Sequence, residues 1–142
     1  MTKESIKLAG QSGLAIAASV EGASDGMPVI LAHGGGQTHR AWKRVSTLLA
    51  SHGFHAIALD LRGHGTSEWA KDGAYGIADF AGDLIAIAAR LERKPALIGA
   101  SLGGLAGIMA EGHLAPGSFA SLTLVDVTPQ MKATGVARVV GF

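Results

Sequence analysis

The chain has 142 residues, of which 48% are hydrophobic and 16% charged, with no cysteine and a formal net charge of +1. These values indicate one globular domain with a substantial core and exclude a disordered chain, disulfide bonds and thiolate metal sites. A charge near zero without a basic run also argues against nucleic acid and anionic membranes as partners.

Two short strands are predicted first, over residues 5–11 and 14–20, joined by a glycine-bounded turn. Two such strands form an antiparallel hairpin. The second stretch is too short and too interrupted for a signal peptide or a membrane span. We therefore expect a cytoplasmic protein that does not contact membranes.

After the hairpin, apolar strands alternate with amphipathic helices. The strands are expected at residues 28–32, 54–59, 96–99 and 119–125, and the helices at 42–52, 77–91 and 102–109. Trp42 and Phe80 are expected in the core. Alternating strands and helices imply right-handed crossovers and parallel pairing. The predicted fold class is α/β: a mostly parallel sheet with an N-terminal antiparallel hairpin and helices on both faces, in one domain over residues 1–142.

A G-x-S-x-G motif, Gly99-Ala100-Ser101-Leu102-Gly103, lies between an apolar strand and a helix. In this motif the serine occupies a tight, strained turn that projects its hydroxyl above the edge of the sheet. Glycines two residues to either side allow neighbouring backbones to approach closely. Because the motif is short and glycine is common in this chain, the strand–turn–helix context gives it its specificity.

A second motif, His33-Gly34-Gly35-Gly36, directly follows the strand at residues 28–32. A loop with so few side chains can aim a backbone N–H at the oxyanion that forms during acyl transfer. The backbone N–H of Leu102, at the start of its helix, would be the second donor. The alternative for the glycine run is an ordinary tight turn.

These two motifs, with the loop at residues 60–67 (Asp-Leu-Arg-Gly-His-Gly-Thr-Ser), resemble in order those of the α/β-hydrolase fold family. The resemblance covers about residues 28–129. It implies that Ser101 is the nucleophile, that Gly35 and Leu102 form the oxyanion hole, and that a small acyl substrate is hydrolysed without cofactor or metal.

The loop at residues 60–67 and the remaining histidines before Ser101 are not expected to be catalytic. In this family the loop at residues 60–67 is usually structural, so Arg62 and His64 are expected to brace it. His39, His52 and His55 show no paired ligand spacing and no carboxylates nearby, so no metal site is expected among them.

The family order of the triad is nucleophile, acid, histidine. Asp126, at the end of the last predicted strand, is a candidate acid; alternatively it only ends the strand. His113 is the one histidine after Ser101, but it lies about 16 Å along the helix, where the helix dipole favours it. We therefore expect that the chain lacks the triad histidine, that the fold is truncated after its sixth strand, and that the isolated chain is inactive or nearly so.

Three other functions stay open. The first is a cofactor-free peroxidase-like reaction within the same family. The second is a non-catalytic fragment or binding protein, whose uncovered edge strand at residues 119–125 would pair with another copy. The third is a dinucleotide-binding module, because Gly99-x-Ser101-x-x-Gly104 imitates that fingerprint, although Ser101 would obstruct the pyrophosphate.

Overall fold

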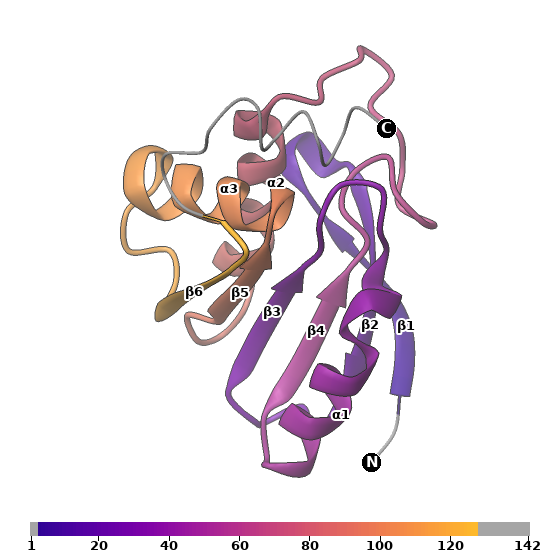
Figure 1. Cartoon of the computed structure of the whole chain (residues 1–142), viewed down its shortest axis with the longest axis vertical. Helices are drawn as coiled ribbons and strands as arrows, with labels where there is room; N and C mark the ends of the chain where they lie inside the picture. The colour runs from indigo at the N-terminus through magenta and orange to yellow at the C-terminus, as the bar shows by residue number, and fades with distance from the viewer. Residues whose placement is uncertain (1–2, 128–142) are drawn as a thin grey trace.

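The computed structural model describes residues 3–127, and these form one six-stranded sheet in the order β1-β2-β4-β3-β5-β6 (Figure 1). The strands are β1 (Lys3–Ala9), β2 (Ala15–Glu21), β3 (Pro28–Ala32), β4 (His55–Leu59), β5 (Ala96–Ala100) and β6 (Ser121–Val125). β1, β2 and β4 pair antiparallel, whereas β4, β3, β5 and β6 pair parallel. The predicted fold class is confirmed.

The first strand of the N-terminal hairpin starts and ends two residues earlier than predicted. β1 ends at Ala9 because the backbone then turns sharply: the Gly10 N–H donates to the Leu14 carbonyl at 2.7 Å. Within the turn, Ser12 and Gly13 have φ values of +56° and +80°, which a strand cannot contain. The alternation of side chains does not show where the backbone leaves the ladder.

Helices cover both faces of the sheet, as predicted. Besides the turn η1 (Gln11–Gly13), they are η2 (His39–Trp42), α1 (Lys43–Ser51), α2 (Ile77–Ala89), α3 (Leu102–Met109) and η3 (Ala110–Leu114). α1 packs on β2 and β4, and α2 and α3 pack together on the opposite face (Figure 1). η3 continues α3 as a π turn, in which the Ala115 N–H donates to the Ala110 carbonyl at 2.8 Å; the sequence did not predict it.

Each central strand contributes side chains to two hydrophobic clusters. In β3, Ile30 belongs to the larger cluster under α2 and α3, whereas Leu31 belongs to the smaller cluster under α1. Phe80 lies in the larger cluster and Trp42 in the smaller one, both buried as predicted. Burial on both faces explains why these strands have continuous apolar sequences.

β6 forms one edge of the sheet. Among residues 3–127 it pairs only with β5, and Val125 is 38% exposed. Pairing of a second copy along this edge stays a prediction. No helix in the described part of the chain is long and apolar enough to cross a membrane.

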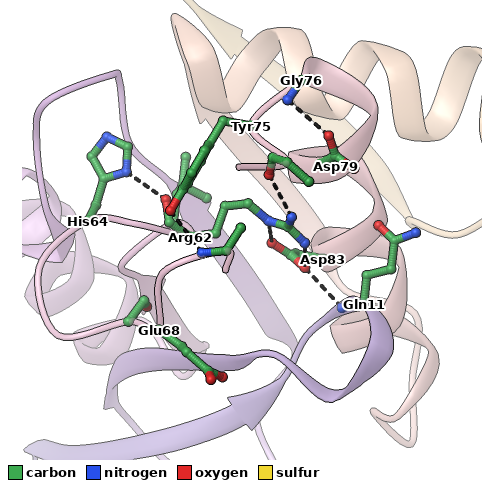
Figure 2. Close-up of polar contacts among 12 residues, drawn as sticks. Gln11, Arg62, His64, Glu68, Tyr75, Gly76, Asp79 and Asp83 are labelled. Atoms are coloured by element: carbon green, nitrogen blue, oxygen red, sulfur yellow. Dashed lines mark hydrogen bonds and ion pairs between the residues drawn. The ribbon is translucent and has the colours of Figure 1, made fainter. Parts of the chain in front are cut away.

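A buried ion pair joins the loop after β4 to α2 and to the hairpin turn (Figure 2). Arg62 donates from Nε to Asp83 Oδ2 at 2.7 Å and from Nη2 to Asp83 Oδ1 at 2.8 Å. Its third nitrogen, Nη1, donates to the Ala74 carbonyl, and Asp83 also accepts the Gln11 N–H. Arg62 therefore braces the loop, as expected.

Removing Asp83 should destabilise the fold strongly, because it leaves a buried guanidinium without its counter-charge. We expect Asp83→Ala to lower the free energy of unfolding by about 3 kcal/mol, measured by urea denaturation. Asp79→Ala is the control. The Asp79 carboxylate accepts the Gly76 N–H at the more exposed start of the same helix, and loss of this hydrogen bond should lower the free energy of unfolding by only about 1 kcal/mol. Equal losses in the two variants would contradict the assigned role of the ion pair.

Candidate active site

Ser101 is the single residue between β5 and α3, and its backbone is strained. Its φ and ψ are +49° and −112°, a region that residues with a Cβ atom rarely occupy. The Ser101 N–H donates to the Val125 carbonyl at 3.2 Å, and its carbonyl accepts the Leu105 N–H at 2.9 Å. Hydrogen bonds to β6 and to the first turn of α3 therefore hold the strained residue in place.

The two glycines of the G-x-S-x-G motif are required by close backbone contacts. A Cβ atom at Gly99 would lie 2.6 Å from the Gly103 carbonyl oxygen, and one at Gly103 would lie 2.2 Å from the Ala32 carbonyl oxygen. The Gly103 N–H also donates to the His33 carbonyl at 3.1 Å. The start of α3 thus packs directly against the end of β3, and the strand–turn–helix context predicted for the motif is confirmed.

The glycine loop after β3 lies beside the elbow and leaves one N–H available. Gly34 donates to Gln37 Oε1 and Gly36 donates to His64 Nε2, each at 3.0 Å. Within the described part of the chain, the Gly35 N–H has no partner. A Cβ atom at Gly35 would lie 3.9 Å from the Leu102 side chain, and the Leu102 N–H also lacks a partner among residues 3–127.

His33 is a fully buried structural residue whose role the sequence did not reveal. Its Nδ1 lies 2.7 Å from the Gly34 carbonyl, and its Nε2 lies 2.9 Å from the Leu61 N–H. A carbonyl can only accept and an amide N–H can only donate, so the ring is neutral with its proton on Nδ1. Burial lowers the pKa of His33 and favours this neutral form.

His64 is bound in the same way. Its Nδ1 donates to the Arg62 carbonyl at 2.9 Å and its Nε2 accepts the Gly36 N–H. The rings of His33 and His64 lie 5.0 Å apart between centroids. The expectation that His64 braces a loop is therefore confirmed, since both of its nitrogens hold backbone groups.

The structure places Asp126 near Ser101 and His113 far along the helix. Asp126 directly follows Val125, whose carbonyl accepts the Ser101 N–H; it is exposed and has a φ of +53°. It makes no hydrogen bond or ion pair with the residues that the structure describes, and its role as an acid stays a prediction. His113 lies in η3, beyond the C-terminal end of α3, and is exposed.

The expectation that His39 has no carboxylate nearby is wrong. His39 Nδ1 lies 2.8 Å from Asp60 Oδ1, which also accepts the His39 N–H at 2.7 Å. Burial raises the pKa of Asp60, but hydrogen bonds from His39 and Thr66 outweigh it, so the net pKa lies below the usual value. No group of three or more potential metal ligands was found between residues 3 and 127.

Comparisons of the sequence match this chain to known proteins. A sequence model described as "alpha/beta hydrolase fold" matches residues 27–141. An esterase from Mycobacterium tuberculosis is 40% identical over 104 residues, covering 71% of this chain and 33% of its own. A non-heme chloroperoxidase from Streptomyces lividans is 33% identical over 109 residues, which cover 76% of this chain and 39% of the chloroperoxidase.

The structural comparison gives the same fold. The crystal structure of an alpha/beta hydrolase from Novosphingobium aromaticivorans matches with a TM-score of 0.84 and 28% identity, covering 99% of this chain and 50% of that one. The chain thus spans about a third to two-fifths of the length of these two curated relatives.

Backbone strain at Ser101 should be measurable. We expect Ser101→Gly to be more stable than Ser101→Ala by about 1 kcal/mol, because glycine adopts a positive φ without steric cost. Ser51, in the last turn of α1, is the control position: there glycine should be less stable than alanine by about 1 kcal/mol. The same sign at both positions in urea denaturation would contradict strain at the elbow.

The neutral state of His33 should make the protein sensitive to acid. Below about pH 6.5 the unfolded chain binds a proton at this histidine that the native state, with its lowered pKa, does not bind. Acid therefore favours unfolding, and the free energy of unfolding should fall as the pH drops below that value. One such proton contributes at most about 1.4 kcal/mol per pH unit.

Urea denaturation between pH 7.5 and 5 measures this contribution. In His33→Gln, whose amide oxygen can accept the Leu61 N–H, we expect a lower stability but a shallower dependence on pH. His113→Gln, at an exposed histidine without a hydrogen bond among the described residues, should keep the wild-type slope. A wild-type slope in His33→Gln would show that His33 is not held neutral.

Proposed function

Because the chain belongs to the alpha/beta hydrolase fold family, we propose that it hydrolyses an ester-type acyl bond with Ser101 as the nucleophile. The observation that carries the proposal is the juxtaposition of a serine on a strained elbow with two backbone N–H groups, of Gly35 and Leu102, that lack partners among the described residues. The similarity to a mycobacterial esterase supports the same class of reaction.

The chemistry follows from this arrangement. The Ser101 hydroxyl oxygen attacks the acyl carbon and transfers its proton to a base, so that the carbonyl oxygen gains a negative charge. The N–H groups of Gly35 and Leu102 then donate to this oxyanion, and each such donor is typically worth about 3 kcal/mol of the barrier. The alcohol leaves with a proton, and water attacks the acyl-serine to release the acid and restore the hydroxyl.

The base that accepts the serine proton is not one of the bound histidines. Both nitrogens of His33 and of His64 hold backbone groups, and within residues 3–127 no histidine makes a hydrogen bond to the Ser101 hydroxyl. We propose that the base comes from outside these residues. We also propose Asp126 as the acid that orients this base, which is supported by its position one residue beyond the strand position paired with Ala100.

A second candidate function is the formation of a peracid, favoured by the similarity to a non-heme chloroperoxidase. Ser101 would form the same acyl intermediate, but hydrogen peroxide would replace water as the attacking group. The products are a peracid and the free serine, so no redox cofactor is needed. Oxidation of bromide that requires both acetate and hydrogen peroxide, and is lost in Ser101→Ala, would favour this function over simple hydrolysis.

Labelling with a fluorophosphonate tests the nucleophile directly. We expect intact-mass analysis to show one adduct on the folded chain, formed faster when free imidazole is added as a substitute base. The adduct should be absent in Ser101→Ala. A folded sample that gives no adduct even with imidazole would contradict the proposal and favour a non-catalytic role.

The proposed oxyanion hole is tested by the rate of the same reaction. Gly35→Pro removes the N–H and should slow labelling about 100-fold. Gly35→Ala is the matched control, because it keeps the N–H and its Cβ atom would meet nothing closer than 3.9 Å. Equal rates in the two folded variants would show that the Gly35 N–H does not stabilise the transition state.

A further inference from the structure

The sheet face that carries α1 is apolar on one side and polar on the other. Over β3 and β4 it is apolar, with Leu31 and Ala58 in the cluster under α1. Over β1 and β2 it is polar: the cross-strand pairs on this face include Lys3 with Glu21 and Ser5 with Ser19. A strip of polar side chains therefore runs alongside η2 and the start of α1.

A small cavity of about 20 Å³ lies between this strip and the start of α1. It has room for one water-sized group. Its polar lining comes from three separate parts of the chain, and consists of Lys3, Ser19, His39, Arg40, Lys43 and Ser46.

The unpaired hydroxyl of Ser46 suggests that this cavity binds a ligand. The residue is 8% exposed, and its hydroxyl is buried without a hydrogen-bond partner in the described part of the chain. Buried hydroxyls nearly always have a partner, because leaving one unpaired is costly. Ser46 is among the residues that line the cavity, so a group that enters the cavity is the nearest candidate for the missing partner.

The charge around the cavity indicates what that group is. Lys3, Arg40 and Lys43 form no ion pair with any residue between 3 and 127. The two acidic residues nearby do not line the cavity: Asp60 accepts hydrogen bonds from His39 and Thr66, and Glu21 accepts one from the Thr47 hydroxyl at 3.1 Å. Three cationic residues and no acidic residue thus line the cavity.

We propose that this cavity binds a tetrahedral oxyanion of the phosphate class. One oxygen enters the cavity and accepts the Ser46 hydroxyl, while Lys3, Arg40 and Lys43 donate to the remaining oxygens at its mouth. Arginine and lysine donors with a hydroxyl are the usual partners of phosphate oxygens. A water molecule would also satisfy Ser46, but only an anion would in addition be attracted by the three exposed cationic residues.

This site is distinct from the Ser101 site and does not depend on the proposed hydrolase function. It lies over β1, β2 and β4, whereas Ser101 follows β5, with β3 between β4 and β5. A second cavity of about 140 Å³, lined by His39, Asp60 and residues of β1 and β2, adjoins it at His39. That cavity has room for the organic part of a phosphate monoester.

An NMR titration of the isotope-labelled chain with sodium phosphate tests the proposal, against sodium chloride at equal ionic strength. We expect saturable shifts at the amides of Arg40, Lys43 and Ser46. Arg40→Gln should weaken phosphate binding about tenfold. Arg44→Gln is the matched control: the charge change is the same and Arg44 lies four residues further along the chain, in α1, but it does not line the cavity, so binding should change less than about twofold.

Equal loss in the Arg40 and Arg44 variants, or no saturation beyond the chloride control, would overturn the proposal and indicate only a diffuse counter-ion atmosphere. Replacing phosphate with glycerol phosphate shows which form of phosphate the site prefers. Tighter binding of glycerol phosphate would indicate a monoester whose organic part extends into the second cavity, and equal binding would indicate free phosphate.

Ser46→Ala gives an independent readout. It should weaken phosphate binding about fivefold, yet leave the thermal midpoint in phosphate-free buffer unchanged or higher, because the hydroxyl has no protein partner to lose. A midpoint lowered by several degrees without phosphate would show that Ser46 has a partner within the protein, and would overturn the proposal.

Discussion

The arrangement around Ser101 depends on one constraint, which is that two adjacent imidazoles each donate from Nδ1 and accept at Nε2. His33 accepts the Leu61 N–H and His64 accepts the Gly36 N–H, so each Nε2 must carry a free lone pair. These two bonds tie the glycine loop after β3 to the loop after β4. A proton on either Nε2 would break a bond that sets the position of the loop.

The same two bonds help to decide which backbone N–H groups of the glycine loop remain without a partner in the described part of the chain. Gly34 donates to Gln37 and Gly36 donates to His64, so the loop offers only the Gly35 N–H on the side of Leu102. The loop after β4 is itself held by Arg62, whose side chain pairs with Asp83 while its carbonyl accepts the His64 proton. Arg62 thus connects α2 to the glycine loop after β3 through His64.

Sequence patterns predicted the strands, the helices and the elbow because each has a local cause. β3 is a continuous apolar run, and the glycines beside Ser101 are fixed by contacts with the Gly103 and Ala32 carbonyls. The bonds of His33, His39 and His64 could not be predicted, because their partners lie 21 to 28 residues away or are backbone groups. Nor does any pattern show that Ser46 lines a cavity with its hydroxyl unpartnered among the described residues.

The two sites share one stretch of chain, and this follows from the topology. The segment that leaves β3 forms the glycine loop first, then η2 and α1, before it returns to β4. Asp60, at the end of β4, holds His39, and the next residue, Leu61, donates to His33. The end of β4 therefore fixes both the start of the glycine loop and the position of His39, which lines the proposed phosphate cavity. A change in the hydrogen bonding of Asp60 would therefore affect both sites, through His39 and through the adjacent Leu61. A substitution at Ser46 should not affect Ser101, because the packed core of β3 and β4 lies between them.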